Sequence, residues 1–130
     1  MSEIIFDPKD LEPIPAGEYA AIVQKAEFLV SKAGNKYLCV DFVIIQGSQQ
    51  GKCISKNFHV SAVDTRYRQD SRRQLARLIK SCGIEGALVE KDLPTIYEKP
   101  LLVQIIETTD SYGETNAVVG FSKLRGSYGA

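Results

Sequence analysis

The feature that most constrains the fold is a change of phase in the apolar pattern of residues 18–30, "EYAAIVQKAEFLV". Apolar side chains first share one parity, at Tyr19, Ala21 and Val23. They then share the opposite parity, at Ala26, Phe28 and Val30. An alternation that changes parity within one strand is typical of a β-bulge, which bends the strand. We therefore predict a long, curved first strand of the kind found in small barrels.

Four further segments have the pattern of short strands. Residues 37–45 alternate, with one face formed by Leu38, Val40, Phe42 and Ile44. In residues 52–60, the side chains of Ile54, Phe58 and Val60 are predicted to face inward. Lys56 shares their parity, so it must lie at a bulge or near the rim of the barrel. The segments "PLLVQIIET" and "NAVVGFSKL" supply the last two strands, and the glycines of "SKAGNK" and "QGSQQG" predict turns.

One helix is predicted between the third and fourth strands, in "DSRRQLARLIKSCG", residues 70–83. Its apolar stripe at helical spacing consists of Leu75, Leu78, Ile79 and Cys82. Asp70 or Ser71 is expected to cap its start, and Gly83 to end it. Residues 84–99 are predicted to be a loop with one helical turn near residues 93–97.

These elements predict a mainly β fold with five strands and a helix between strands 3 and 4. That is the order of the OB-fold, a partly open barrel whose strands 2 and 3 bind oligonucleotides or oligosaccharides. A sandwich or an unrelated α+β domain has the same order and stays open as an alternative. The length of 130 residues suits one domain, with residues 1–16 as an extended lead-in and residues 125–130 as a flexible tail.

Composition favours a cytoplasmic protein. No apolar run approaches the roughly 18 residues of a membrane span, and the acidic start "MSEIIFDPKD" is unlike a secretory signal. The three cysteines lack metal-site spacing, and there is a single histidine. We therefore expect reduced thiols and no metal or other cofactor.

The net charge of zero hides an uneven distribution. Residues 19–80 carry eleven Lys and Arg against four acids, a balance of +7. Residues 1–18 have a balance of −4, and residues 81–130 a balance of −3. A local positive field attracts polyanions even when the whole molecule is neutral. The alternative interpretation is an ordinary solvated surface.

Several segments together resemble a group of small phage and prophage proteins. They are "IPAGEYAAIV", "VSKAGNKYLCVDFVI", "GKCISKNFHV", "LARLIKSCGI" and "NAVVGFSKL", within residues 14–124. That group is catalogued as a domain of unknown function and belongs to replication and recombination gene modules. The resemblance implies an OB-type barrel that binds single-stranded DNA in the bacterial host cytoplasm. It also implies recombination or replication proteins as partners, and no catalytic residue.

The candidate binding residues come from the physical chemistry of single-strand binders, which combine a basic groove with aromatic stacking surfaces. If Ile45 lies opposite Gly51, then Tyr37 lies across from His59 and both face outward. Nearby lysines are expected to hold phosphates, and a loop before the helix adds two arginines and a tyrosine. The predicted set is Lys32, Lys36, Tyr37, Lys52, Lys56, His59, Arg66, Tyr67, Arg68 and Arg72.

Two other classes of function are the alternatives. An enzyme is not expected, because His59 lies about 20 Å along the strand from Cys53 and no phosphate-binding loop or acidic metal cluster is present in the sequence. A protein-interaction or virion module on the same barrel, with no nucleic-acid binding, stays open. Oligomers are common among single-strand binders, so a homodimer is the default expectation.

Overall fold

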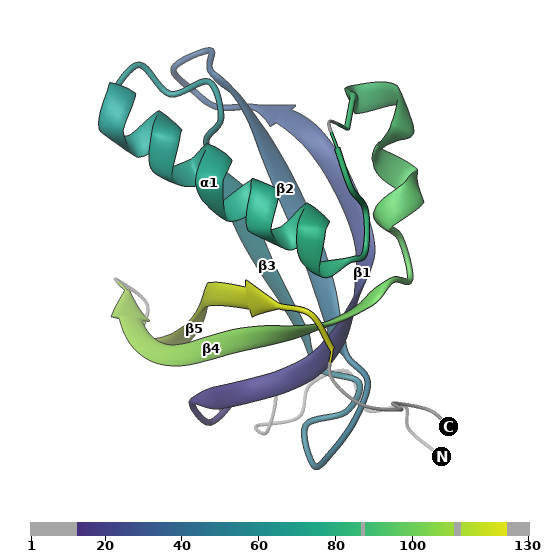
Figure 1. Ribbon diagram of the computed structural model, residues 1–130. Coiled ribbons are helices and arrows are strands. Elements are labelled where there is room, and N and C mark those ends of the chain that lie inside the picture. The colour runs from purple at the N-terminus through teal and green to yellow at the C-terminus, as the bar shows by residue number, and fades with distance from the viewer. Residues whose placement is uncertain (1–12, 87, 111–112, 125–130) are drawn as a thin grey trace, which may run out of the picture.

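The computed structural model describes residues 13–86, 88–110 and 113–124. Most of the expected N-terminal lead-in and the whole of the expected tail, residues 125–130, lie outside the described residues. The predicted order of strands and helix is confirmed (Figure 1). The elements are β1 (Gly17–Val30), β2 (Lys36–Ile44), β3 (Cys53–Phe58), α1 (Thr65–Ser81), the 3₁₀-helix η2 (Glu90–Ile96), β4 (Pro100–Asp110) and β5 (Gly113–Ser122).

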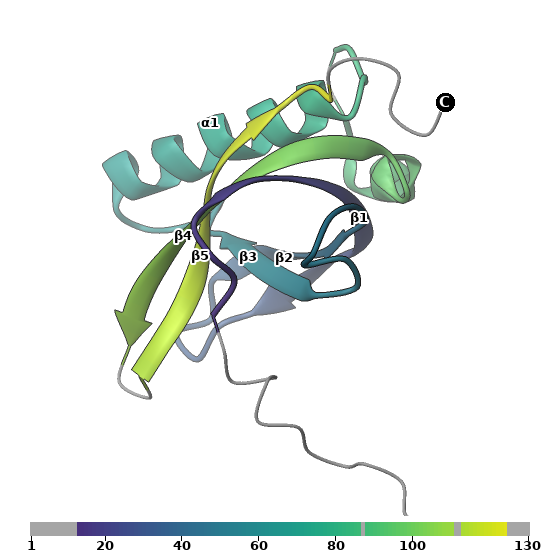
Figure 2. The ribbon, with the colours of Figure 1, turned by 90° about the horizontal axis from the view of Figure 1, so that it is seen from below.

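The five strands form one antiparallel sheet in the order β3-β2-β1-β4-β5. β1 is shared between two neighbours, because it pairs with β4 over residues 17–22 and with β2 over residues 21–30. The predicted bulge is confirmed: the register shifts between Val23 and Lys25, so Gln24 is the extra residue. Figure 2 shows β1 curving strongly around the rest of the sheet.

The inner face of the sheet forms the core together with α1 and η2. Leu38, Val40, Phe42 and Ile44 are fully buried, as their alternation predicts, and Leu78 of α1 is buried against them. The parity of β1 also holds through Ala21, Val23 and Ala26. The prediction that Val30 faces the core is wrong. Its side chain is 69% exposed, because Val30 forms the last pair of the β1–β2 ladder, beyond the packed part of the face.

Strand pairing does not close the sheet into the expected barrel within the described residues, since β3 and β5 are the two edges of the sheet. Side chains connect these edges instead. The Nζ atom of Lys56 on β3 donates a hydrogen bond to the carbonyl oxygen of Val118 on β5, at 2.8 Å. The ring of Phe121 on β5 lies 6.0 Å from that of Phe58 and 5.7 Å from that of Phe42. The core is therefore continuous across the gap between the edges.

The helix begins earlier than its apolar stripe predicts. Asp64 is its N-cap, and the Asp64 carboxylate accepts a hydrogen bond from the backbone N–H of Tyr67 at 2.9 Å. The predicted caps are wrong, because Asp70 lies within the helix and Ser71 is buried there. The stripe begins only at Leu75, so the polar first turns carry no apolar signal. The end is as predicted, with Gly83 at φ 86° just beyond the helix.

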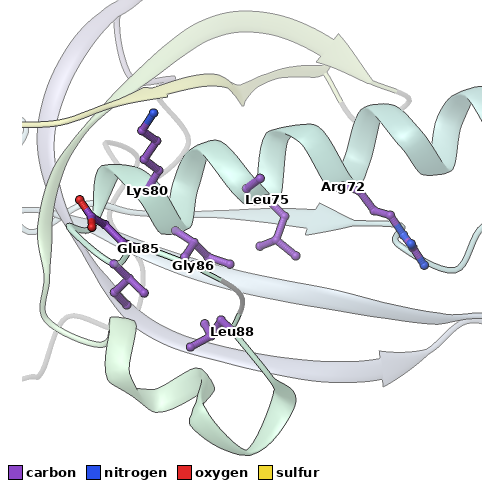
Figure 3. A pocket seen from close by; sticks show the side chains of 9 residues that line it. Arg72, Leu75, Lys80, Glu85, Gly86 and Leu88 are labelled. Carbon is purple, nitrogen blue, oxygen red and sulfur yellow. The ribbon is translucent and has the colours of Figure 1, made fainter.

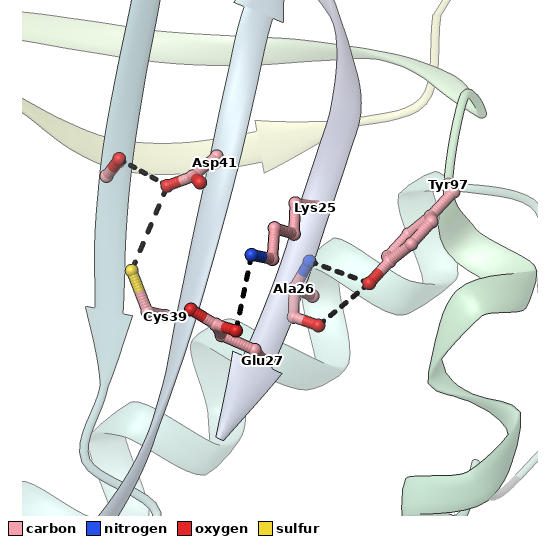
Figure 4. Close-up of polar contacts among 7 residues, drawn as sticks. Lys25, Ala26, Glu27, Cys39, Asp41 and Tyr97 are labelled. Atoms are coloured by element: carbon pink, nitrogen blue, oxygen red, sulfur yellow. Dashed lines mark hydrogen bonds and ion pairs between the residues drawn. The ribbon is translucent and has the colours of Figure 1, made fainter. Parts of the chain in front are cut away.

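A tyrosine from the segment after η2 supports the bulge. The Tyr97 hydroxyl donates to the carbonyl oxygen of Ala26 at 2.9 Å and accepts from the Ala26 N–H at 3.2 Å (Figure 4). The Glu98 N–H donates to the carbonyl oxygen of Val23 at 2.8 Å. These bonds satisfy β1 just past residue 22, where its pairing with β4 ends at Pro100. Among the described residues, no helix is both long enough and apolar enough to cross a bilayer.

The Tyr97 contact predicts a measurable loss of stability on Tyr97→Phe. The variant keeps the ring but leaves the Ala26 N–H and C=O without this partner, so the free energy of unfolding should fall by about 1–3 kcal/mol. Urea denaturation measures the change. Tyr67→Phe, at an exposed ring, is the matched control and should shift stability by less than about 0.5 kcal/mol. Equal effects of the two changes would show that the Tyr97 hydroxyl has no special role at the bulge.

Candidate nucleic-acid interface

Three rings from three elements stack at one end of the sheet. β2 and β3 pair in the predicted register, with Leu38 opposite Phe58, which places Tyr37 across from His59. The two ring centroids are 5.3 Å apart with planes 29° from parallel. Tyr67 of α1 also stacks on His59, with ring centroids 5.3 Å apart and planes 28° from parallel. We call Tyr37, His59 and Tyr67 the aromatic row.

The aromatic row lies at the protein surface. Tyr67 is 51% exposed, while Tyr37 and His59 are half-buried. Leu29 of β1 pairs with Tyr37 and is 36% exposed, so it extends the row on the outer face of the sheet. The position of Tyr67 depends on the cap described above, because Asp64 binds the backbone N–H of this same residue. The row therefore offers flat apolar surface that is held in place from both its sheet end and its helix end.

Two of the predicted lysines lie at this end of the sheet. Lys32 is exposed in the turn between β1 and β2. Lys36, the first residue of β2, forms an ion pair with Glu90 at 2.9 Å, and its Nζ atom lies 4.6 Å from the centre of the Phe28 ring. Both groups of the ion pair are half-exposed, so the pair is weak and a phosphate can compete with the carboxylate.

The other two lysines are not brought to the row. Lys52 follows the turn at the opposite end of β2 and β3, about 20 Å along the strand from His59. Lys56 points to β5 rather than to the outer face, because it keeps the inward parity of its strand. Burial lowers the pKa of Lys56 below its ordinary value, and the charge of Asp70 only partly opposes this effect. The structure therefore places Lys56 between β3 and β5 and away from the aromatic row, and its expected role in holding phosphate stays a prediction.

Arg66 and Arg68 lie on α1 and not in a loop before it, while Arg72 lies on the helix as predicted. Arg66 is exposed beside Tyr67 in the first turn. Arg68 and Arg72 face the segment that joins β3 to the helix: Arg68 Nη1 donates to the carbonyl oxygen of Ala62 at 3.4 Å, and Arg72 Nε to that of Val60 at 3.1 Å. Part of each guanidinium group thus holds the segment that follows His59. In this structure Arg68 and Arg72 therefore support the backbone next to His59, a member of the aromatic row.

The outer face next to the row carries negative charge. Glu27 forms an ion pair with Lys25 at 3.3 Å, and Asp41 accepts hydrogen bonds from Ser55 Oγ and, at 3.9 Å, from Cys39 Sγ (Figure 4). These carboxylates separate Lys52 from the row. The basic residues of positions 19–80 therefore do not line a single channel, as the charge distribution suggested.

Residues 6–129 match the family described as "Protein of unknown function (DUF669)". The chain belongs to this family. No curated protein matches it. The family description agrees with the resemblance to a group catalogued as a domain of unknown function, while the phage origin and the binding of single-stranded DNA stay predictions.

This family member also has a groove that its sequence did not predict. The groove has a volume of about 680 Å³ and lies between α1 and the segment after it (Figure 3). Its apolar lining is formed by Leu75, Ile79, Ile84 and Leu88, and its charged lining by Arg72, Lys80 and Glu85. The sequence signal that could have indicated it is the pair of aliphatic residues after Gly83, which continues the apolar stripe of the helix.

The thiols that burial affects are poor nucleophiles. Burial, followed by the charge of Asp41, raises the pKa of Cys39 above its ordinary value. Burial raises the pKa of Cys82 to about 11. Since the thiolate is the reactive form, neither environment activates its cysteine. Within the described ranges, no group of three His, Cys, Asp or Glu side chains is placed to hold a metal ion.

The lowered pKa of Lys56 predicts a pH effect on stability. The unfolded chain binds a proton at Lys56 more tightly than the folded chain does, so the folded state gains stability as pH rises through the folded pKa. Compared with Lys56→Met, the wild type should therefore become more stable as the pH rises toward the ordinary lysine pKa of 10.5. Chemical denaturation of both proteins at each pH measures the difference. A difference that stays constant over this rise in pH would contradict the buried position of the amine.

Proposed function

We propose that this protein binds single-stranded DNA without sequence specificity, on an OB-type barrel whose β3–β5 seam is held by side chains. The observation that carries the proposal is the aromatic row. Three features support the OB-type interpretation: β1 is shared between β2 and β4, the helix lies between β3 and β4 in the chain, and Lys56 bonds across the seam. Tyr37 lies on β2 and His59 directly follows β3, the two strands on which OB-folds bind their ligands, while Tyr67 joins them from α1.

The chemistry of the row suits nucleobases. Every base has a flat face, and stacking on an aromatic side chain contributes about 1–3 kcal/mol per base with little dependence on sequence. Lys32, Lys36 and Arg66 lie at the same end of the molecule and provide positive charge for the backbone. The resemblance to phage proteins adds the expected setting: a replication or recombination module in the bacterial cytoplasm, with proteins of that module as partners.

A protein-interaction or virion module is the second candidate function. The groove beside α1 favours it, because its mainly apolar lining suits a peptide or protein side chain better than a phosphate backbone. The acidic outer face around Glu27 and Asp41 also gives nucleic acid no support there. Failure to bind any single-stranded oligonucleotide at low salt would favour this alternative.

A titration with oligo-dT tests the main proposal. Binding is followed through a fluorescent label on the oligonucleotide, because only two of the chain's six tyrosines, Tyr37 and Tyr67, belong to the row. We expect Tyr37→Leu with Tyr67→Leu to weaken binding about 10- to 100-fold, because two stacking surfaces are removed. Tyr37→Phe with Tyr67→Phe keeps both rings and is the matched control, expected to stay within about twofold of wild type.

One result of this titration would contradict the proposal. If the leucine variants fold and bind oligo-dT as tightly as the phenylalanine variants, the aromatic row is not the binding surface. Duplex DNA of the same length serves as competitor, and it should displace the oligonucleotide poorly because its bases are already stacked.

A further inference from the structure

We propose that the exposed face of α1 is a phosphate-binding track that carries the DNA strand away from the aromatic row. This inference rests on the proposed function, since it assigns a second contact surface to the same ligand. The track consists of Arg66, Arg73, Arg77 and Lys80, which we call the basic stripe. Only Arg66 belongs to the set that the sequence predicted.

Helical geometry places the stripe on one face. Its members follow Arg66 by 7, 11 and 14 residues, which are the spacings that return to the same side of an α-helix. All four side chains are exposed, whereas Ser71, Leu78 and Ser81 of the same helix are buried. From Arg66 to Lys80 the stripe extends for about 21 Å at the helical rise of 1.5 Å per residue. It begins beside Tyr67, so it is continuous with the aromatic row.

No member of the basic stripe forms an ion pair within the described part of the fold. The ion pairs among the described residues are Lys25–Glu27 and Lys36–Glu90, and neither involves α1. The two nearby carboxylates have other hydrogen-bond partners. Asp64 accepts from the Tyr67 N–H at the helix cap, and Asp70 accepts from Gln74 Nε2 at 3.4 Å. Exposed cations at fixed spacing are the arrangement that releases counterions when a polyanion binds.

A hollow lies at each end of the stripe. The first, of about 570 Å³, is lined by Arg66 and Arg73 together with Tyr67, and Asp64 and Asp70 also line it. The second, of about 410 Å³, is lined by Arg77 and Lys80, and Lys123 joins them from the end of β5. Cations from two separate elements thus converge around Phe121, with Glu85 as the one acid. Lys123, which directly follows β5, thus adds a cation from a second part of the chain to the end of the stripe.

The test compares two triple variants that remove the same charge. Arg73→Gln, Arg77→Gln and Lys80→Gln change the stripe but leave Arg66 and the aromatic row intact, and glutamine keeps the helix propensity. The control is Lys25→Gln, Lys52→Gln and Lys91→Gln, which lie away from α1. Both are titrated with oligo-dT of about 4 and about 16 nucleotides, between about 50 and 200 mM salt.

The stripe variant should bind the longer oligonucleotide more weakly. Its slope of log affinity against log salt should be smaller by about 2, because each phosphate that a cation neutralises on a single strand adds about 0.7 to the slope. The shorter oligonucleotide should be affected less, and the control should keep the wild-type slope. Equal slopes for the two triple variants would overturn the track, because net charge alone would then explain the effect.

A chain of inorganic polyphosphate separates this inference from the proposed function, since it has phosphates but no bases. The wild type should bind it, Tyr37→Leu with Tyr67→Leu should bind it nearly as well, and the stripe variant should bind it at least about tenfold more weakly. If oligo-dT fails to bind but polyphosphate depends on the stripe, the proposed function fails and the track stands. If polyphosphate fails to bind the wild type, or binds the stripe variant equally well, the track is refuted.

Discussion

At Gln24 the backbone of β1 takes up one extra residue, and close to this point the strand changes both its partner and its direction. Without the extra residue, the side chains after Val23 would fall on the wrong face of the sheet, because the side-chain period of a strand is two. The bulge returns Ala26 to the inner face, and the hydroxyl of Tyr97 holds the backbone there. The resulting curvature brings β3 near enough to β5 for Lys56 to span the gap.

The aromatic row depends on the same register. A slip of one residue between β2 and β3 would separate Tyr37 from His59 and would expose core residues of β3. The third ring depends on a different device, the capping of α1 by Asp64, which sets the place of Tyr67. The rings are therefore held in place before any ligand arrives, and under the proposed function little ordering entropy would oppose the stacking of a base.

The electrostatic surface illustrates why net charge is a poor guide to binding. The chain is neutral overall, yet its cations serve different purposes: Lys56 lies against a carbonyl, Lys36 pairs with a carboxylate, and the basic stripe meets solvent. Glu27 and Asp41 occupy the outer face of the sheet between Lys52 and the row. Positive potential is therefore expected along the helix more than along the strands.

The pattern of residues alone predicted the order of the elements, the bulge in β1, the buried face of β2 and the pairing that sets Tyr37 across from His59. These follow from alternation of side chains and from turn residues, both of which act over a few neighbouring positions. Three features became clear only from the three-dimensional fold: Lys56 turns to β5, Lys52 lies far from the row, and the polar turns before Leu75 are helical and bring Tyr67 into the row. Each of these features depends on a contact between segments far apart in the chain or on a polar helix cap. The spacing of apolar residues in the sequence predicts neither of these.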